Sequence, residues 1–359
     1  MQYKLAEICS RLSSGKSIPS SEVLRSGHFP VYGGNGIRGY AEQFNFEGEC
    51  AIIGRQGAMC GNVRYFSGQA YMTEHAVVVC GNEKCDTRYL AYVLSSMNLG
   101  RLSAQSAQPG LSVKVLGQQV IDLPDKTTQS KISALLASIE NKIAINDKIN
   151  GCLEAQAKSY FEEIITAQDF PMGALSDVAE VTMGQSPRGK SMNESREGIV
   201  FFQGRGEFGS RFPTIRLFTT EPSRFAKSGD VLMSVRAPVG DLNIAHEDCC
   251  IGRGLAAIHG KNGHHSFIYY TLLGAKEQLD VFNGQGTVFG SINRDGLRGL
   301  RVKVPPLEVI KRFEELAHPI DEEILRNENE TRRLSIIRDS LLPKLMSGDI
   351  DVDSIKLDQ

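Results

Sequence analysis

The chain is an internal duplication, and this repeat limits the possible folds more than any other feature. At a shift of 170 residues, LAEI at 5–8 aligns with LSDV at 175–178, and VYGGNG at 31–36 aligns with FFQGRG at 201–206. At a shift of 181, GECAIIGR at 48–55 aligns with GDVLMSVR at 229–236, which matches Arg55 with Arg236. The second copy therefore holds 11 extra residues between Gly206 and Gly229. A period this long indicates duplication of a whole domain and not a solenoid.

A long helical pattern follows each domain, because apolar residues recur at spacings of four and three. Each pattern predicts a helix of roughly 35 to 40 residues, or roughly 55 to 60 Å. Both stripes are interrupted at equivalent places by an asparagine, which in a coiled-coil seam fixes register at some cost in stability. We predict that the two helices pair with each other, although each stripe could instead pack onto its own domain. The predicted helix-pairing residues are Ile132, Leu136, Ile139, Ile143, Asn146, Leu153, Phe313, Ile320, Ile324, Asn327, Leu334 and Leu341.

The domains themselves are predicted to be of mixed structure, with short strands such as AIIGR, HAVVVC, VLMSVR and LAAIH. Helices are expected at TRYLAYVLSSM and SFIYYTLLGA. The order of these elements does not define a sheet topology. We expect domains at 1–125 and 169–305, a central helix at 126–168, and a C-terminal helix and tail at 306–359.

Charge is distributed unevenly, although the chain as a whole has a net charge of −2. The C-terminal part, 306–359, carries 8 Lys and Arg against 13 Asp and Glu, whereas 170–305 carries 16 against 13, with 11 of the 16 being arginine. This pattern favours local phosphate contacts over a general polycation. No stretch approaches the roughly 20 apolar residues that cross a bilayer, so we expect a cytoplasmic protein without a membrane partner.

Motifs for catalysis and metal binding find little support. GQSPRGKS at 184–191 formally matches a phosphate-binding loop, yet SMNESREG after it lacks the apolar face of a packed helix. A nucleotide hydrolase using Lys190 and Ser191 nevertheless stays open as an alternative. Gly34, Gly36 and Gly39 form G-x-G-x-x-G without a helix behind them. The eight cysteines include no C-x-x-C pair and the seven histidines no H-E-x-x-H, so neither a metal site nor a catalytic residue is predicted.

Glycine-flanked polar loops in both copies carry Arg, Gln, Asn and Lys, side chains that pair with base edges or phosphates. For any one of these side chains, an ordinary role in a turn is as good an explanation as a DNA contact. The whole set is stronger evidence for DNA binding than any single residue in it. The DNA-binding candidates are Lys16, Asn35, Arg38, Arg55, Gln56, Asn62, Gln105, Gln108, Gln185, Arg188, Lys190, Gln203, Arg205, Arg211, Arg236, Asn243, Gln285, Asn293 and Arg294.

The whole chain resembles the specificity subunit of type I restriction-modification enzymes. The resemblance rests on YGGNGIRGY, IGRQGAMCGNV and TEHAVVV in the first copy, and on RDSLLPKLMSGDIDV at 338–352. It implies an α+β fold, in which two pseudo-symmetric mixed α/β target-recognition domains are joined by two long antiparallel coiled-coil helices. Each domain would read one half of a split site in double-stranded DNA.

The resemblance also implies partners. Two methyltransferase subunits would dock beside the helices, and restriction subunits driven by ATP would join them. The chain itself would be non-catalytic and hold no cofactor, since S-adenosylmethionine, ATP and Mg²⁺ would belong to the partner subunits. A protein-interaction adaptor that does not read DNA is the remaining alternative.

Overall fold

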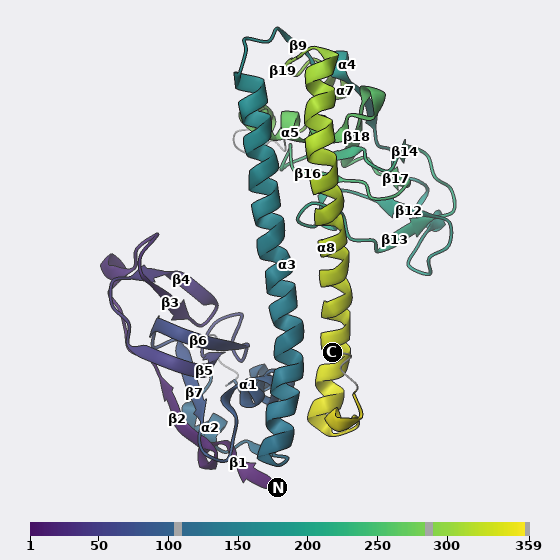
Figure 1. Cartoon of the computed structure of the whole chain (residues 1–359). Helices are drawn as coiled ribbons and strands as arrows, with labels where there is room; N and C mark the ends of the chain where they lie inside the picture. The colour runs from purple at the N-terminus through teal and green to yellow at the C-terminus, as the bar shows by residue number, and fades with distance from the viewer. Residues whose placement is uncertain (104–109, 284–289, 356–359) are drawn as a thin grey trace. The chain divides into compact units, whose positions relative to one another are not determined.

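The computed structural model describes residues 1–103, 110–283 and 290–355. The chain divides into two compact units, one formed by residues 1–144 and 332–359 and the other by residues 145–331. Two helices of 41 residues, α3 (Lys126–Thr166) and α8 (Leu307–Ser347), each contribute to both units (Figure 1). Their first residues lie 181 positions apart, and so do their last, which is the shift at which the second halves of the two domains match.

The first unit is built around a six-stranded sheet in the order β2-β7-β5-β6-β3-β4. All neighbouring strands are antiparallel except β3 and β6. A separate pair, β1 with β8, joins the two ends of the domain. The strands are β1 (Gln2–Lys4), β2 (Cys9–Ser14), β3 (Phe29–Gly33), β4 (Gly36–Ala41), β5 (Phe46–Gly54), β6 (Val63–Met72), β7 (Ala76–Gly81) and β8 (Val120–Asp122), and the helices of the domain are α1 (Thr87–Ser96) and α2 (Val113–Gly117).

Alternation along β5 and β7 divides the core of the first unit between the two faces of the sheet. Ile53 and Val79 face a large cluster that also holds residues of α1, α3 and α8, among them Leu136 and Leu345. Ile52 faces a smaller cluster on the opposite side. The sheet is therefore attached to the helices through one face only.

The second unit distributes its strands over a four-stranded sheet, β10-β18-β15-β16, and a five-stranded sheet, β11-β13-β12-β17-β14. The pair β9 with β19 corresponds to β1 with β8. Its strands are β9 (Met172–Ala174), β10 (Ala179–Met183), β11 (Met192–Asn193), β12 (Ile199–Phe202), β13 (Leu217–Thr219), β14 (Phe225–Ala226), β15 (Val231–Ser234), β16 (Leu242–Ile244), β17 (Cys249–Ile251), β18 (Leu255–Gly260) and β19 (Arg301–Lys303), and its helices are α4 (Leu175–Val178), α5 (His265–Gly274), α6 (Lys276–Asp280) and α7 (Arg294–Arg298).

Within the second unit, α3 and α8 pack against each other in antiparallel orientation. The rings of Phe161 and Phe313 lie 5.3 Å apart, whereas earlier on α3 and later on α8 the Asn146 amide donates to Glu330 at 2.8 Å. Asn327 donates to the side chain of Asn150 at 2.9 Å. The two asparagines that interrupt the stripes therefore lie together in the helix pair.

The apolar stripes serve the domains as well as the helix pair. Phe161 and Phe313 also contact the ring of Phe267 on α5, at 5.8 and 6.3 Å between centroids. The apolar stripes therefore pair the two helices with each other and also pack onto the domain. Among the twelve predicted helix-pairing residues, Ile132, Leu136, Ile139, Asn146, Phe313, Ile324 and Asn327 are buried and Ile143, Leu153, Ile320, Leu334 and Leu341 are half-buried.

The segment 184–191 does not have the structure of a phosphate-binding loop. It leads from β10 into a single 3-10 turn, Gly189–Ser191, and then into β11, so no α-helix begins there to supply backbone amides. The Ser191 hydroxyl is buried and lies 3.0 Å from that of Thr219. The hydrolase alternative is therefore not supported. In the described part of the chain, no helix combines the length and apolar character that membrane crossing requires.

Candidate nucleic-acid interface

Four segments of the first domain meet at one end of the six-stranded sheet. Lys16 donates its backbone N–H to Met72, and Arg55 donates to His75, both at 2.9 Å. Gly34 lies in the turn between β3 and β4, where an added Cβ would be 3.2 Å from the His75 carbonyl oxygen and 3.3 Å from that of Gln56. Glycine therefore favours the close approach of these loops, because an added Cβ would be tight against both carbonyl oxygens. We call this end the first loop edge, formed by residues 15–16, 34–36, 55–62 and 73–75.

The first loop edge contains five of the predicted residues. Lys16, Asn35 and Gln56 are exposed there, and Arg55 and Asn62 are half-buried. The Arg55 guanidinium lies 3.4 Å from the Ser14 hydroxyl. Arg38 is exposed next to this edge on β4, where its aliphatic stem lies across Gly33. Gln105 and Gln108 lie outside the described residues.

The second domain has an equivalent edge. Gln185 donates its backbone N–H to Ile251 at 3.0 Å, and Val235 donates to Gly254 at 2.9 Å. Gly252 and Gly254 both approach the carbonyl oxygen of Gln203, where an added Cβ would be 2.7 and 3.0 Å away. We call this end the second loop edge, formed by residues 184–190, 203–205, 235–237 and 252–254.

The second loop edge brings together Gln185, Gln203 and Arg236, all of them exposed. Arg188 and Lys190 are exposed in the same loop as Gln185. Arg205 is exposed but forms an ion pair with Asp241. The remaining candidates are Asn293, whose side chain caps α7 by accepting from Gly296 at 2.8 Å, the exposed Arg294, and Gln285, which lies outside the described residues.

Two predicted residues are interior and cannot reach DNA in this structure, so those predictions are wrong. Arg211 is 1% exposed; it forms an ion pair with Asp321 and lies over the ring of Tyr269 at 4.1 Å. Burial alone would lower its pKa, but the neighbouring carboxylate of Asp321 holds it above the ordinary value. Asn243 is also 1% exposed, and its side chain accepts from Gly209 at 3.0 Å. Both residues hold the inserted segment of the second copy in place.

The structure also corrects the match between Arg55 and Arg236. Leu111 donates its N–H to the carbonyl of Arg55, and the equivalent Ile292 donates to that of Val235. Isolated bridges pair Gln56 with Gly110 and Arg236 with Ser291. In the backbone, Arg236 therefore corresponds to Gln56, one residue away from the match that the sequence suggests. The two copies place different side chains at the same point of their edges.

The fold brings two further arginines, which were not among the predicted residues, to the loop edges. Arg253 is exposed between Gly252 and Gly254, with its N–H 3.5 Å from the Ser186 hydroxyl. Arg64 on β6 is exposed, and its guanidinium lies against Gly36. Arg205 was predicted because it lies in a glycine-flanked loop, and the glycines on either side of Arg253 could have identified it in the same way. No local sequence pattern identifies Arg64, because strand pairing is what brings it to the loop edge.

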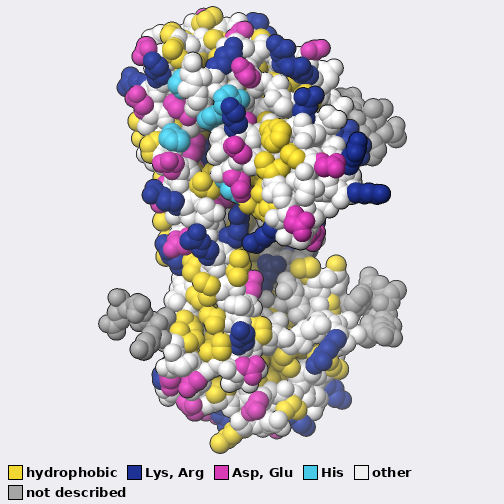
Figure 2. All heavy atoms as spheres, turned by 90° about the vertical axis from the view of Figure 1, so that its right-hand side faces the viewer, with side chains coloured by type: hydrophobic (Ala, Val, Ile, Leu, Met, Phe, Trp, Pro, Cys, Tyr) yellow, Lys and Arg dark blue, Asp and Glu magenta, His cyan; other side chains and the backbone are white. Residues whose placement is uncertain are grey.

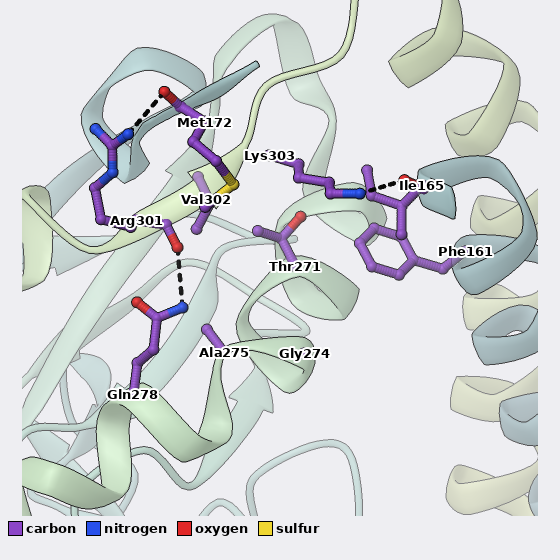
Figure 3. Close-up of a pocket in the computed structure, with 10 residues that line it drawn as sticks. All are labelled: Phe161, Ile165, Met172, Thr271, Gly274, Ala275, Gln278, Arg301, Val302 and Lys303. Atoms are coloured by element: carbon purple, nitrogen blue, oxygen red, sulfur yellow. Dashed lines mark hydrogen bonds between the residues drawn. The ribbon is translucent and has the colours of Figure 1, made fainter. Parts of the chain in front are cut away.

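The surface of the second unit mixes basic and acidic side chains (Figure 2). An apolar pocket of about 240 Å³ lies beside the C-terminal end of α3 in this unit, lined by residues of α3, α5, α6, β9 and β19 (Figure 3). Lys303 donates to the Ile165 carbonyl at 3.0 Å, Arg301 to that of Met172 at 3.0 Å, and Gln278 to that of Arg301 at 3.1 Å. Each of these three side chains thus binds a backbone carbonyl at the rim of the pocket.

Three thiols of the first domain have raised pKa values. Burial raises the pKa of Cys9, Cys50 and Cys85 to about 12, so these thiols are protonated at neutral pH and unreactive.

Fold and site together define a class of protein: a duplicated mixed α/β scaffold that presents polar loops in each copy.

Comparison with known proteins identifies the family. The model of the type I restriction modification DNA specificity domain matches residues 1–155 and 168–331, and the chain belongs to this family. A putative type I restriction enzyme MjaX specificity subunit of Methanocaldococcus jannaschii is 28% identical over 322 residues, covering 81% of this chain and 76% of that protein. The EcoprrI specificity subunit of Escherichia coli is 39% identical over 130 residues, covering 35% of this chain and 32% of that protein.

A solved structure supports the fold over nearly the full length. The S subunit of a type I restriction-modification system from M. genitalium superposes with a TM-score of 0.73 at 14% identity, covering 96% of this chain and 95% of that one. At this level of identity the similarity concerns the fold. The chain is thus a specificity subunit of the type I class, which is non-catalytic, as the resemblance implied.

Proposed function

We propose that this chain reads a bipartite site in double-stranded DNA, one half with each domain, through the two loop edges. The observation that carries the proposal is their equivalence: the same backbone hydrogen bonds hold both edges, while the side chains at matching positions differ. Gln56 in one copy and Arg236 in the other carry the groups that pair with adenine and guanine edges, respectively. The two halves of the site should therefore differ in sequence.

The first edge is proposed to use Lys16, Asn35 and Gln56, with Arg38, Arg55, Asn62 and Arg64 beside them. The second edge would use Gln185, Gln203 and Arg236, with Arg188, Lys190, Arg205 and Arg253. Asn293 and Arg294 are further candidates at the start of α7. Phosphate contacts position a protein on the duplex and base contacts specify the sequence, so this set should contain both kinds.

The partners follow from the class. We propose that two methyltransferase subunits dock beside the domains and helices, and that restriction subunits join them. S-adenosylmethionine, ATP and Mg²⁺ would be bound by those subunits. Because its target is DNA, the complex would act in the cytoplasm.

Modified-base sequencing tests the proposal. DNA from cells that express this chain together with its methyltransferase subunit is compared with DNA from cells that express the methyltransferase alone. We expect a new methylated motif made of two short parts separated by an unspecified spacer. An intact complex without any new methylation would favour the adaptor alternative.

A further inference from the structure

Three residues far apart in the sequence meet on the second domain. Asp230 directly precedes β15, His259 lies on β18, and His265 is the first residue of α5. One carboxylate oxygen of Asp230, Oδ1, lies 2.6 Å from Nδ1 of His259 and 4.0 Å from Nδ1 of His265. One ligand atom from each residue lies within 4.8 Å of the other two. Histidine side chains also gather on the surface of this unit (Figure 2).

The hydrogen-bonding groups of this cluster do not all have partners among the described residues. The Nδ1 atom of His265 is buried and has no hydrogen-bond partner among the described residues. The second carboxylate oxygen of Asp230 accepts the Lys227 N–H at 2.8 Å, which holds the carboxylate in place. Gly229 packs against the His265 ring, where an added Cβ would lie 2.9 Å from the ring. A fixed ring with a buried, unpaired nitrogen is costly unless something binds that nitrogen.

We propose that Asp230, His259 and His265 form a binding site for a divalent transition-metal ion, with Zn²⁺ as the best match to two imidazoles and one carboxylate. Zn²⁺ binds nitrogen and carboxylate oxygen at about 2.0 to 2.2 Å. The three ligand atoms lie within 4.8 Å of one another and would surround the ion after the side chains adjust. Side chains of His259 and His265 are 35% and 22% exposed, which leaves solvent access for a water molecule as the fourth ligand.

The site belongs to the second copy alone. By alignment of β7 with β18 and of α1 with α5, the first copy has Cys80 and Thr87 in place of the two histidines. Thr87 is already engaged, since its hydroxyl accepts the Gly81 N–H at 3.0 Å. The metal would therefore tie α5 to the sheet in the second domain only. It would also stiffen the attachment to α8, because Glu314 of α8 accepts the N–H groups of Ser266 and Phe267 at 3.1 and 3.0 Å.

Metal titration of the purified, untagged full-length chain tests this site. After chelator treatment, Co²⁺ is added as a spectroscopic probe, and Zn²⁺ binding is measured by calorimetry. We expect one ion per chain, a Co²⁺ spectrum typical of four-coordinate nitrogen and oxygen ligands, and at least tenfold weaker binding after His259→Gln or His265→Gln. The matched control is His318→Gln, which removes a neighbouring exposed histidine of α8 and should leave affinity unchanged.

Two results would overturn the proposal: wild-type protein that binds Zn²⁺ no more tightly than the His265→Gln variant, or binding that depends on His318. Should the variants fail to fold, X-ray absorption of the wild-type chain with one equivalent of Zn²⁺ still decides the question. Two imidazole nitrogens in the coordination sphere support the site, and a sphere without imidazole contradicts it.

Discussion

The two copies agree in their long helices and in the backbone hydrogen bonds of their loop edges. They differ in how their domains are attached and in the side chains that their loop edges carry. In the first copy, Arg88 and Tyr92 of α1 bind Glu140 of α3 at 3.2 and 2.7 Å. In the second, Arg211 from the inserted segment binds Asp321 of α8 and lies 3.6 Å from Glu154 of α3. Either attachment can hold a domain against the same pair of helices. Packing therefore constrains the helices and the sheets, while the side chains of the loop edges remain free to differ.

Arg211→Ala should have the largest effect on stability. It removes the partner of Asp321, whose side chain is only 12% exposed, and breaking a buried pair costs about 3–5 kcal/mol. Urea unfolding of the full-length chain measures this loss. Arg205→Ala, just before the inserted segment, is the control: its ion pair with Asp241 is at the surface, so it should cost less than about 1 kcal/mol. Equal effects would show that the Arg211 contacts do not hold the insertion.

Substitutions at the loop edges should separate the two copies by DNA sequence. Arg236→Ala should lower discrimination at one half of the site by about 1–3 kcal/mol, or about 5- to 150-fold, and leave the other half unchanged. Gln56→Ala should do the reverse. Methylation of DNA libraries randomised at each half measures both effects. If either variant relaxed both halves, the domains would not read independently.

Asn146→Ala should have a smaller effect, a loss of about 1 kcal/mol. The asparagine is fully buried and donates to Glu330 at 2.8 Å, and a hydrogen bond to a charged group contributes somewhat more than a neutral one. Thermal unfolding measures the change. Ser159→Ala, on the exposed face of the same helix, is the control and should be nearly neutral. A more stable Asn146→Ala chain would mean that the asparagine costs stability and serves register alone.

Tyr92→Phe should be the mildest of these changes, destabilising by about 0.5 kcal/mol. It removes the hydrogen bond to Glu140, but Arg88 still pairs with that carboxylate. The same unfolding measurement applies, and the result belongs beside that for Arg211→Ala. An effect as large as that of Arg211→Ala would mean that the two attachments are equivalent in strength, contrary to their burial.

The helices could be predicted from sequence because their periodicity is local and repeated, and Asn146 and Asn327 identified the pairing. Sheet order could not, because strand pairing depends on contacts between distant residues. The same limit explains the errors at the site. Arg211 and Arg236 are both arginines near glycines, and only the fold shows that one is buried and the other exposed. The grouping of Asp230 with His259 and His265 is likewise invisible to motif spacing.

The most direct test of independent reading by the two domains is a domain exchange followed by modified-base sequencing. The first domain, proposed as residues 1–125, is replaced by that of a related specificity subunit with a known site, and the chimera is expressed with the methyltransferase. Independent reading predicts a methylated motif in which only one half has changed to that of the donor and the other half is retained. A motif altered in both halves, or unaltered in both, would contradict it.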